Sequence, residues 1–441
     1  MHLDPKNLKR DFLRFIFASM MAQWIFALYS AVDGMFVARG VNEVALSAVN
    51  IASPFINFLF SISLLFAAGT STVAAIYLGQ GKKQRASQIV TQNLALVVIL
   101  AVVITAAVLL FPESIAAFLG ATEETMEYVI AYITSIAPFS VFFIVAYEFE
   151  MLVKTDGYPK YATMAIISGC LINCILDYIF IFHLHMGVIG AGLATGIAQF
   201  TLVIIYLIHF FGPRATLKIV PFHFERKELW RIIKIGLPSG LTELSAGLTI
   251  FLFNHAIIAY LNNDALVTYT IIGYVNTIVV MGMAGIAQGA QPMISYYYGQ
   301  GSNQYVKKLL YYGLVSASIL AALIFTGCLT GADFFVRLFI SSENTSLLAS
   351  SAAVFRIFSI SFLIMGFNVV VCGFFTAIER PVGSLVISLA RGLVTIAVSI
   401  FLMTALFGGP GIWWAATVSE CMCLVITTLL FKWQKRRGQL Y

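Results

Sequence analysis

Apolar residues occur along the chain in long continuous runs that short polar segments separate. One run, IVTQNLALVVILAVVITAAVLLF, extends from Ile89 to Phe111 without a charged residue. A transmembrane helix needs about 20 apolar residues in succession, whereas a transmembrane strand needs only about 10 residues of alternating polarity. The runs therefore predict twelve transmembrane helices, near residues 12–37, 46–72, 89–111, 125–153, 160–183, 188–211, 232–260, 268–296, 305–328, 346–376, 381–406 and 411–432.

The composition agrees with this interpretation. Of the 441 residues, 60% are apolar and only 10% are charged, whereas soluble domains contain about 25% charged residues. A soluble globular protein is therefore excluded.

The 26 lysine and arginine residues are distributed unevenly between the two sides of these helices. Twenty-two fall in the N-terminal segment, the C-terminal tail and the loops that follow even-numbered helices. The other loops contain only Arg39 and Arg337, while Arg356 and Arg391 lie within spans. Because cytoplasmic loops carry the excess of basic residues, both termini are predicted to be cytoplasmic. The formal charge of +6 thus reflects topology, and we expect no nucleic-acid partner.

The two halves of the chain are related by an internal repeat. At a constant offset of 220, GTSTVAAIYLGQGKKQRASQ (Gly69–Gln88) aligns with GAQPMISYYYGQGSNQYVKK (Gly289–Lys308), with the GQG sequence in common. Each repeat has an even number of spans, so the repeats are parallel. The predicted fold class is an all-α integral membrane protein with twelve transmembrane helices in two six-helix bundles related by a parallel pseudo-two-fold repeat. The expected units are an N-lobe (1–212, helices one to six), a cytoplasmic linker (213–231) and a C-lobe (232–441, helices seven to twelve).

Acidic residues inside spans are costly and are functional candidates by default. Asp33 lies near the outer end of helix one, and Asp177 lies on helix five with Asn173 one turn before it. An antiparallel helix six brings the hydroxyl group of Thr195 towards the same face. Such an oxygen-rich cluster suits a hard cation such as Na⁺, and two close carboxyl groups also suit a proton carrier. The alternative is a purely structural hydrogen-bond network.

Glu243 follows Gly236-Leu237-Pro238 on helix seven. The repeat places Gln23 opposite Glu243 and Phe253 opposite Asp33, so the carboxylates of the two halves do not coincide. We therefore expect ion coupling in the N-lobe and substrate contact or gating in the C-lobe. The structural alternative for Glu243 is a hydrogen bond to backbone groups that the proline frees.

Other charged residues of the spans are assigned structural roles. Glu148 and Glu150 approach the cytoplasmic end of helix four beside Lys154, where long side chains reach the interface. Three residues of helices ten to twelve are expected to pair with one another: Arg356, Arg391 and Glu420.

The sequence contains no pattern typical of a membrane-embedded enzyme. No HExxH metal motif, GxxxxGK[ST] phosphate loop or GxGxxG strand-turn-helix unit is present. We expect neither an enzyme nor a resident cofactor, with Na⁺ or H⁺ present only as a transported coupling ion.

Several segments together resemble the multidrug and toxic compound extrusion (MATE) family, in its DinF-type and MepA-like prokaryotic branch. They are SAVDGMFVARGVNEVALSAVN, the GQG turns, KTDGYPKY, IGLPSGLTEL and AQGAQPMISYYYGQG. The resemblance implies a V-shaped cleft between two lobes in the plasma (inner) membrane of a prokaryote. It also implies a monomeric antiporter that exports cationic amphipathic organic compounds in exchange for protons or sodium by alternating access.

The resemblance also implies roles for individual residues. Four N-lobe residues match the family's cation site, Tyr132 matches an N-lobe tyrosine, and Glu243 matches an acid of helix seven. The four are Asp33, Asn173, Asp177 and Thr195. Two departures concern Ala18, where a proline associated with bending of helix one is usual, and helix ten, which has no acid before Glu379. A flippase of lipid-linked oligosaccharides, from the same superfamily, is the alternative function, and it would be expected to have more helices and a basic cavity.

Overall fold

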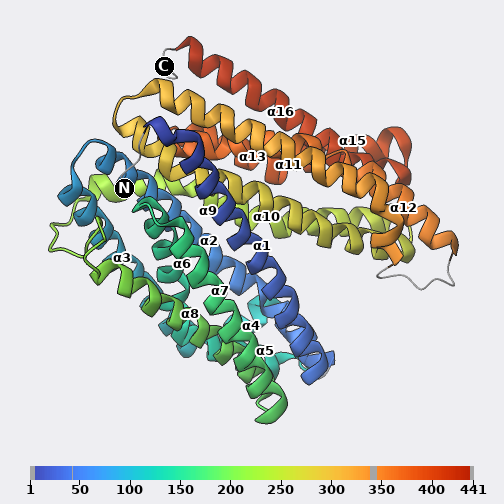
Figure 1. The fold of residues 1–441 in the computed structure, drawn as a ribbon. Coiled ribbons are helices and arrows are strands. Elements are labelled where there is room, and N and C mark those ends of the chain that lie inside the picture. Colours follow the sequence, from blue (N-terminus) through green and yellow to red (C-terminus); the bar gives the residue numbers. More distant parts are fainter. Residues whose placement is uncertain (1–4, 42, 338–344, 438–441) are drawn as a thin grey trace.

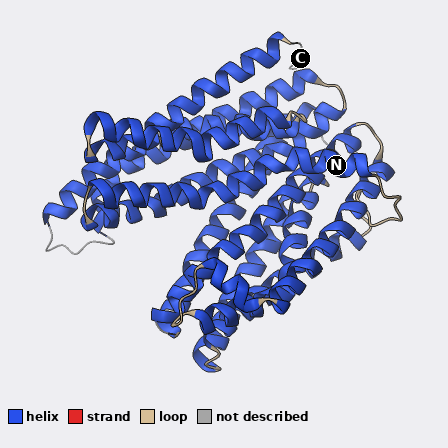
Figure 2. Cartoon of the chain, turned by 180° about the vertical axis from the view of Figure 1, so that it is seen from behind, coloured by secondary structure: helices blue, strands red, loops and turns tan. Residues whose placement is uncertain are grey.

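The computed structural model describes residues 5–41, 43–337 and 345–437, which are almost entirely helical and contain no strand (Figure 2). The helices of the first half are α1 (Leu8–Gly40), α2 (Glu43–Gly79), α3 (Lys83–Leu110), α4 (Pro112–Leu119), α5 (Met126–Ile136), α6 (Ser140–Thr155), α7 (Pro159–Asp177) and α8 (Gly187–Phe211). Those of the second half are α9 (Arg226–Tyr260), α10 (Asn263–Gly299), α11 (Asn303–Arg337), α12 (Thr345–Ser359), α13 (Phe362–Ala377), α14 (Pro381–Leu389), α15 (Thr395–Phe407) and α16 (Ile412–Arg436).

Twelve helical segments of the described residues are long and apolar enough to cross a membrane, as predicted. Three of them combine two helices: the fourth joins α5 to α6, the tenth α12 to α13, and the eleventh α14 to α15. Several helices begin earlier than the apolar pattern suggested, and α9 starts at Arg226 rather than at 232. The reason is physical: hydrophobicity marks only the hydrocarbon layer, while the helices continue into the polar interface.

The helices form two lobes that meet at one end and diverge at the other (Figure 1). We call the meeting end, which carries both termini and the α2–α3 and α10–α11 turns, the closed end. At the opposite, open end the N-lobe and the C-lobe point away from each other. The predicted fold class, two helical bundles in an all-α membrane protein, is confirmed.

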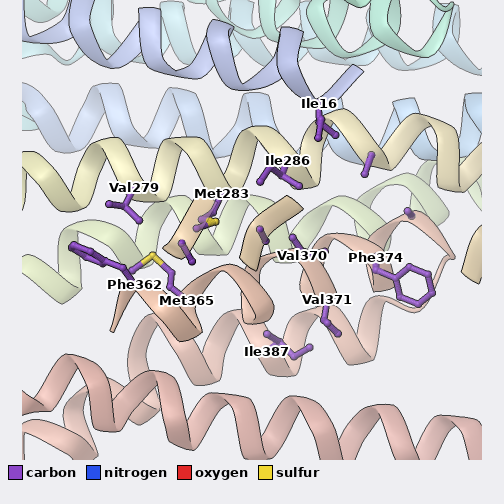
Figure 3. Packing of buried hydrophobic residues seen from close by; sticks show 14 of the residues in the cluster. Ile16, Val279, Met283, Ile286, Phe362, Met365, Val370, Val371, Phe374 and Ile387 are labelled. Atoms are coloured by element: carbon purple, nitrogen blue, oxygen red, sulfur yellow. The ribbon is translucent and has the colours of Figure 1, made fainter. Parts of the chain in front are cut away.

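The lobes are joined mainly through α1 and α2 of the N-lobe. Helix α1 packs along α10, and α2 packs against α9 and α10. Figure 3 shows Ile16 of α1 beside Ile286 of α10, in a buried cluster that continues through Met283 to α13. The apolar core is therefore continuous across the seam between the lobes.

Glycines allow the helices to approach closely at this seam. A Cβ atom added to Gly79 of α2 would lie 2.0 Å from the carbonyl oxygen of Tyr296, and one added to Gly299 of α10 would lie 2.3 Å from that of Ile76. Both pairs are related by the 220-residue offset, so α2 and α10 cross at a point of the repeat's pseudo-symmetry. In membranes, where lipid is as apolar as leucine, such close packing is a main source of helix association.

Ion pairs tie the linker and the two lobes together at the closed end. Arg231 donates from Nε to Glu379 Oε1 at 2.6 Å, joining α9 to the segment after α13. Tyr77 of α2 donates to Glu228 Oε1 at 2.8 Å, which connects the N-lobe to the first turn of α9. Arg85 of α3 forms a short bidentate pair with Glu225, and this hydrogen bonding lowers the pKa of the Glu225 carboxyl group.

Residues near the end of α6 differ in part from the prediction. Lys154 and Glu150 do form an ion pair, at 2.5 Å, but their side chains are only 0% and 8% exposed and do not reach the interface. Glu148 is fully buried and accepts a hydrogen bond from Asn93 Nδ2 at 2.7 Å instead of pairing with the lysine. The difference arises because α3 and α8 cover this face of α6.

The predicted C-lobe charge group is correct for two of its three members. Arg391 donates to Glu420 Oε1 at 2.9 Å, and Asn368 donates to Glu420 Oε2 at 2.8 Å. Arg356 instead pairs with Asp333 at 2.6 Å, on the neighbouring helix α11. The prediction missed this partner because it considered only helices ten to twelve.

Candidate functional site

The candidate ion site begins where the helical geometry of the fifth span changes. Helix α7 ends at Asp177 and continues as the π-helical segment Tyr178–His183. A π-helical turn within a membrane span is uncommon and is frequent at functional sites. Asp177, the last residue before this segment, is fully buried.

Four predicted residues come together around this position. Asp33 of α1 brings its carboxyl group close enough to Asp177 to share a hydrogen bond. With its amide nitrogen facing Asp177, Asn173 donates to Asp177 Oδ2 at 2.7 Å, and its oxygen accepts from the backbone N–H of Thr195 at 3.1 Å and from its hydroxyl at 3.3 Å. We call Asp33, Asn173, Asp177 and Thr195 the N-lobe oxygen cluster.

Two tyrosines border the cluster. Tyr132 of α5, also predicted, is 6% exposed and lies within electrostatic range of both carboxyl groups. Tyr29 was missed, although its hydroxyl lies next to Thr195. A signal was available: Tyr29 precedes Asp33 by four residues, which places both on one face of α1.

The cluster has free capacity to hold a cation. Within the described residues, the Oδ1 atoms of Asp33 and Asp177 are buried and have no hydrogen-bond partner. Two bare carboxylates this close repel each other, so a shared proton or an intervening cation stabilises them. Carboxylate, amide and hydroxyl oxygens are the ligands that hard cations prefer.

A cavity of about 510 Å³ lies between the lobes. Helices α1, α2, α5, α6 and α8 of the N-lobe and α9, α10 and α13 of the C-lobe line it. Its lining contains two carboxylates, Asp33 and Glu243, and among the described residues that form it there is no lysine, arginine or histidine. We call this cavity the cleft.

Aromatic rings cover the N-lobe wall of the cleft. Phe60 lies at the centre of the group, 5.6 Å from Phe26, 5.9 Å from Phe143 and 5.5 Å from Tyr147 between ring centroids. The rings meet edge to face, which leaves ring faces available to a bound cation. The sequence does not reveal this group, because its four residues come from three helices. The chain also contains 37 phenylalanines, and nothing in the sequence distinguishes the three in this group from the others.

Glu243 projects from the opposite, C-lobe wall. The structural alternative for this residue is a hydrogen bond to a backbone group that Pro238 frees. Glu243 is half-buried and lines the cleft, and the neighbouring Thr242 donates to the Pro238 carbonyl at 2.8 Å. Its repeat counterpart Gln23 forms a hydrogen bond to Gln288 of the other lobe at 2.8 Å, on the cleft lining. The structure therefore does not bring Glu243 into the N-lobe oxygen cluster.

Known proteins resemble the chain over nearly its whole length. The multidrug export protein MepA of Staphylococcus haemolyticus is 24% identical over 431 residues, and the MepA of Staphylococcus aureus (strain MRSA252) is 23% identical. Both alignments cover 97% of this chain and 94% of the relative.

Solved structures share the fold. An outward-facing MATE transporter of the MOP superfamily superposes with a TM-score of 0.90 at 22% identity, covering 98% of this chain and 96% of that one. A MOP superfamily transporter from Pyrococcus furiosus, for which reverse polarity of the binding pocket suggests a different function, superposes with a TM-score of 0.88 at 22% identity and the same coverage. At these identities the likeness establishes the fold and leaves the substrate to be argued from the cleft.

The MatE family model matches residues 18–179 and 239–401, one match in each half of the repeat. These matches cover most of the chain, and they include the N-lobe positions 33, 132, 173 and 177 as well as position 243. This multi-pass membrane protein therefore belongs to the MatE family, the multidrug and toxic compound extrusion transporters, which are not enzymes.

Proposed function

We propose that this protein exports cationic, amphipathic organic compounds across a prokaryotic plasma membrane in exchange for protons or sodium. One observation carries the proposal: the cleft is lined by two carboxylates and an aromatic wall, without a basic residue among its described lining. In a site partly shielded from water, this charge attracts cations and rejects anions. Aromatic faces and apolar walls accommodate organic cations of variable shape.

The geometry also supports a mechanism for coupling. Asp33, Tyr132 and Thr195 line the cleft, and they also belong to or border the N-lobe oxygen cluster. A substrate pressed against this wall and a cation entering the cluster compete for the same carboxylate. Binding of one therefore favours release of the other, as exchange requires. A cation moving inward down about 100 mV supplies about 2.3 kcal/mol, before any concentration gradient is added.

The relatives support the same function at a coarser level. The staphylococcal proteins are multidrug export proteins, and one solved MATE transporter was crystallised with the molecule MaL6. A flippase of lipid-linked oligosaccharides is less well supported, because pyrophosphate would need basic residues that the described cleft lining does not contain.

Transport by the purified protein in liposomes tests the proposal. We expect an imposed proton or sodium gradient, each varied alone, to drive accumulation of a permanently cationic dye. A neutral dye of similar size should be transported more weakly. Export that requires neither gradient, or that favours anionic dyes, would contradict the proposal and direct attention to the flippase.

Glu243→Gln should weaken transport of cationic dyes more than that of neutral dyes. The substitution removes the only C-lobe carboxylate in the described lining of the cleft but preserves the side-chain volume. We expect KM for the cationic dye to rise by about tenfold, the factor that 1.4 kcal/mol corresponds to. Concentration series with both dyes measure the effect, and an equal loss for the two would indicate gating or structure instead.

The proposal also assigns the closed end to the cytoplasm, because this end carries the excess of basic residues. Single cysteines, introduced after the six native ones are replaced, should divide into two groups when intact cells meet an impermeant thiol reagent. Positions at the open end should react: Glu123, His185 and Asp264. Positions at the closed end should not: Lys82, Lys218 and Lys307. Labelling of both groups would require a different topology.

A further inference from the structure

A second large cavity, of about 1080 Å³, lies between α1 and α7 on the outside of the N-lobe near the closed end. It shares no lining residue with the cleft, although neighbouring turns of α1 line the two cavities. The proposed transport function makes no use of it. We call it the α1–α7 groove.

Each of the two helices contributes one stripe of side chains to the groove. On α1 the stripe comprises Arg10, Arg14, Phe17 and Met21, spaced by four, three and four residues along one helical face. On α7 it begins at Lys160 and continues through apolar positions of the next turns. Both stripes therefore run from basic at the helix start to apolar deeper in the span.

The basic ends of both stripes meet at one rim. Three basic side chains, Arg10, Arg14 and Lys160, line the groove together with a single acidic one, Asp11. The first turns of α1 and α7 also lie at this rim, and the positive ends of their helix dipoles add to the field. The rim is therefore suited to bind an anion, whereas the cleft is suited to bind a cation.

The deeper walls are apolar and open to the surroundings. Leu13, Phe17 and Met164 are 46%, 64% and 62% exposed, although all three lie within membrane spans. Their exposed faces therefore meet hydrocarbon rather than water. Methionines at positions 20, 21 and 164 give the lining the flexibility to follow a disordered chain.

We propose that the α1–α7 groove binds an anionic phospholipid, with the phosphate group at Arg10, Arg14 and Lys160 and an acyl chain along the apolar walls. The charge of the rim and the continuity of the groove with the bilayer together select this ligand. If the closed end is cytoplasmic, the site faces the leaflet whose surface carries the negative potential. A soluble phosphate compound would use the rim but not the apolar walls.

The position of the groove gives such a lipid a structural role at the seam. Thr163 of α7 donates to the carbonyl of Ala18 at 2.8 Å, so the two helices touch at the base of the groove. Helix α1 also packs on α10 of the C-lobe, where backbone atoms of Met20 and Ile16 lie against Gly285 and Gly289. A lipid in the groove therefore braces the helix on which the two lobes meet.

The test compares lipids that differ only in headgroup charge. Purified full-length protein is reconstituted in nanodiscs or mixed micelles that contain dioleoyl phosphatidylglycerol and dioleoyl phosphatidylcholine in equal amounts, and retained lipid is measured by native mass spectrometry. The wild type should retain phosphatidylglycerol at least about tenfold over phosphatidylcholine, because each basic residue near the membrane surface favours the anionic lipid several-fold. Glycerol 3-phosphate should not displace it, because the apolar walls supply part of the binding.

Three variants decide whether the groove is responsible. Neutralising the rim (Arg10→Gln, Arg14→Gln and Lys160→Gln together) should abolish the preference, while Arg10→Lys with Arg14→Lys should keep it. Met164→Trp fills the groove at an exposed position without changing charge and should reduce retention of the lipid. This variant tests the groove even if the neutralised protein fails to fold.

The matched control removes three basic residues of the same membrane end that lie outside the groove: Lys82, Lys83 and Lys308. This control should bind phosphatidylglycerol as the wild type does. An equal loss in the control would mean general surface attraction and would overturn the proposal. The absence of any headgroup preference in the wild type, or displacement by glycerol 3-phosphate alone, would overturn it as well.

Discussion

Replacing Asp177 by asparagine is expected to abolish gradient-driven export while leaving a folded protein. Asparagine keeps the shape of the side chain and its hydrogen bond with Asn173, but it removes the charge that a cation needs. Hydrogen bonds to charged groups contribute about 1.5–3 kcal/mol, so the loss corresponds to a decrease in cation affinity of about 10- to 100-fold. Initial rates of dye efflux from liposomes, at a fixed ion gradient, measure the effect.

Asp33→Asn should have the same effect on coupling, because its carboxyl group lies close enough to that of Asp177 to share a hydrogen bond. It should also weaken substrate binding, since Asp33 lines the cleft and Asp177 does not. Thr195→Ala should reduce transport less, because a neutral ligand is lost rather than a charge. This graded order distinguishes a cation site from a structural hydrogen-bond network, in which Thr195 and the aspartates would be equally important for stability.

Asp333→Asn provides the control for this series. Asp333 also lies in a membrane span, but it is exposed and paired with Arg356 in the C-lobe, so it does not belong to the N-lobe oxygen cluster. Its removal should leave transport near the wild-type rate. Normal gradient-driven export by folded Asp33→Asn or Asp177→Asn protein would refute the assignment of the coupling site.

The sequence was sufficient for much of the candidate site because simple spacing rules apply there. Asn173 and Asp177 are one helical turn apart, and Thr195 follows across a short antiparallel connection, so their proximity could be derived. Asp33 was found through the cost of an acid in a span, not through spacing. That cost applies to any fold, so Asp33 could be singled out as a candidate without the tertiary structure.

Features that depend on contacts between distant helices could not be derived in this way. The burial of Lys154 results from the helices that cover α6, and the partner of Arg356 lies on a helix that the sequence argument did not consider. The π-helical segment after Asp177 also has no signature in the apolar pattern. Each of these features depends on packing or desolvation between helices that are distant in the sequence. The order of apolar and polar residues along the chain does not specify those contacts.

Gly79→Ala and Gly299→Ala are expected to destabilise the protein strongly at the closed end. The new Cβ atom would lie 2.0 Å or 2.3 Å from a backbone oxygen of the facing helix, and a backbone cannot yield as a flexible side chain does. Overpacking of this kind costs about 1–3 kcal/mol. Thermal unfolding followed by intrinsic fluorescence should report a lower midpoint for both variants, and transport should fall because α2 and α10 join the lobes.

Gly327→Ala is the matched control, because no atom lies within 4 Å of a Cβ atom added there. Alanine in a helix is about 0.5–1 kcal/mol more favourable than glycine, so this variant should be neutral or slightly stabilised. The double variant Gly79→Ala/Gly299→Ala gives the sharper result. Both glycines lie at one crossing, so a single separation of α2 from α10 relieves both clashes, and the double variant should lose less stability than the two single losses combined. Strict additivity would mean that the two contacts are independent and that the crossing is not a single pseudo-symmetric point.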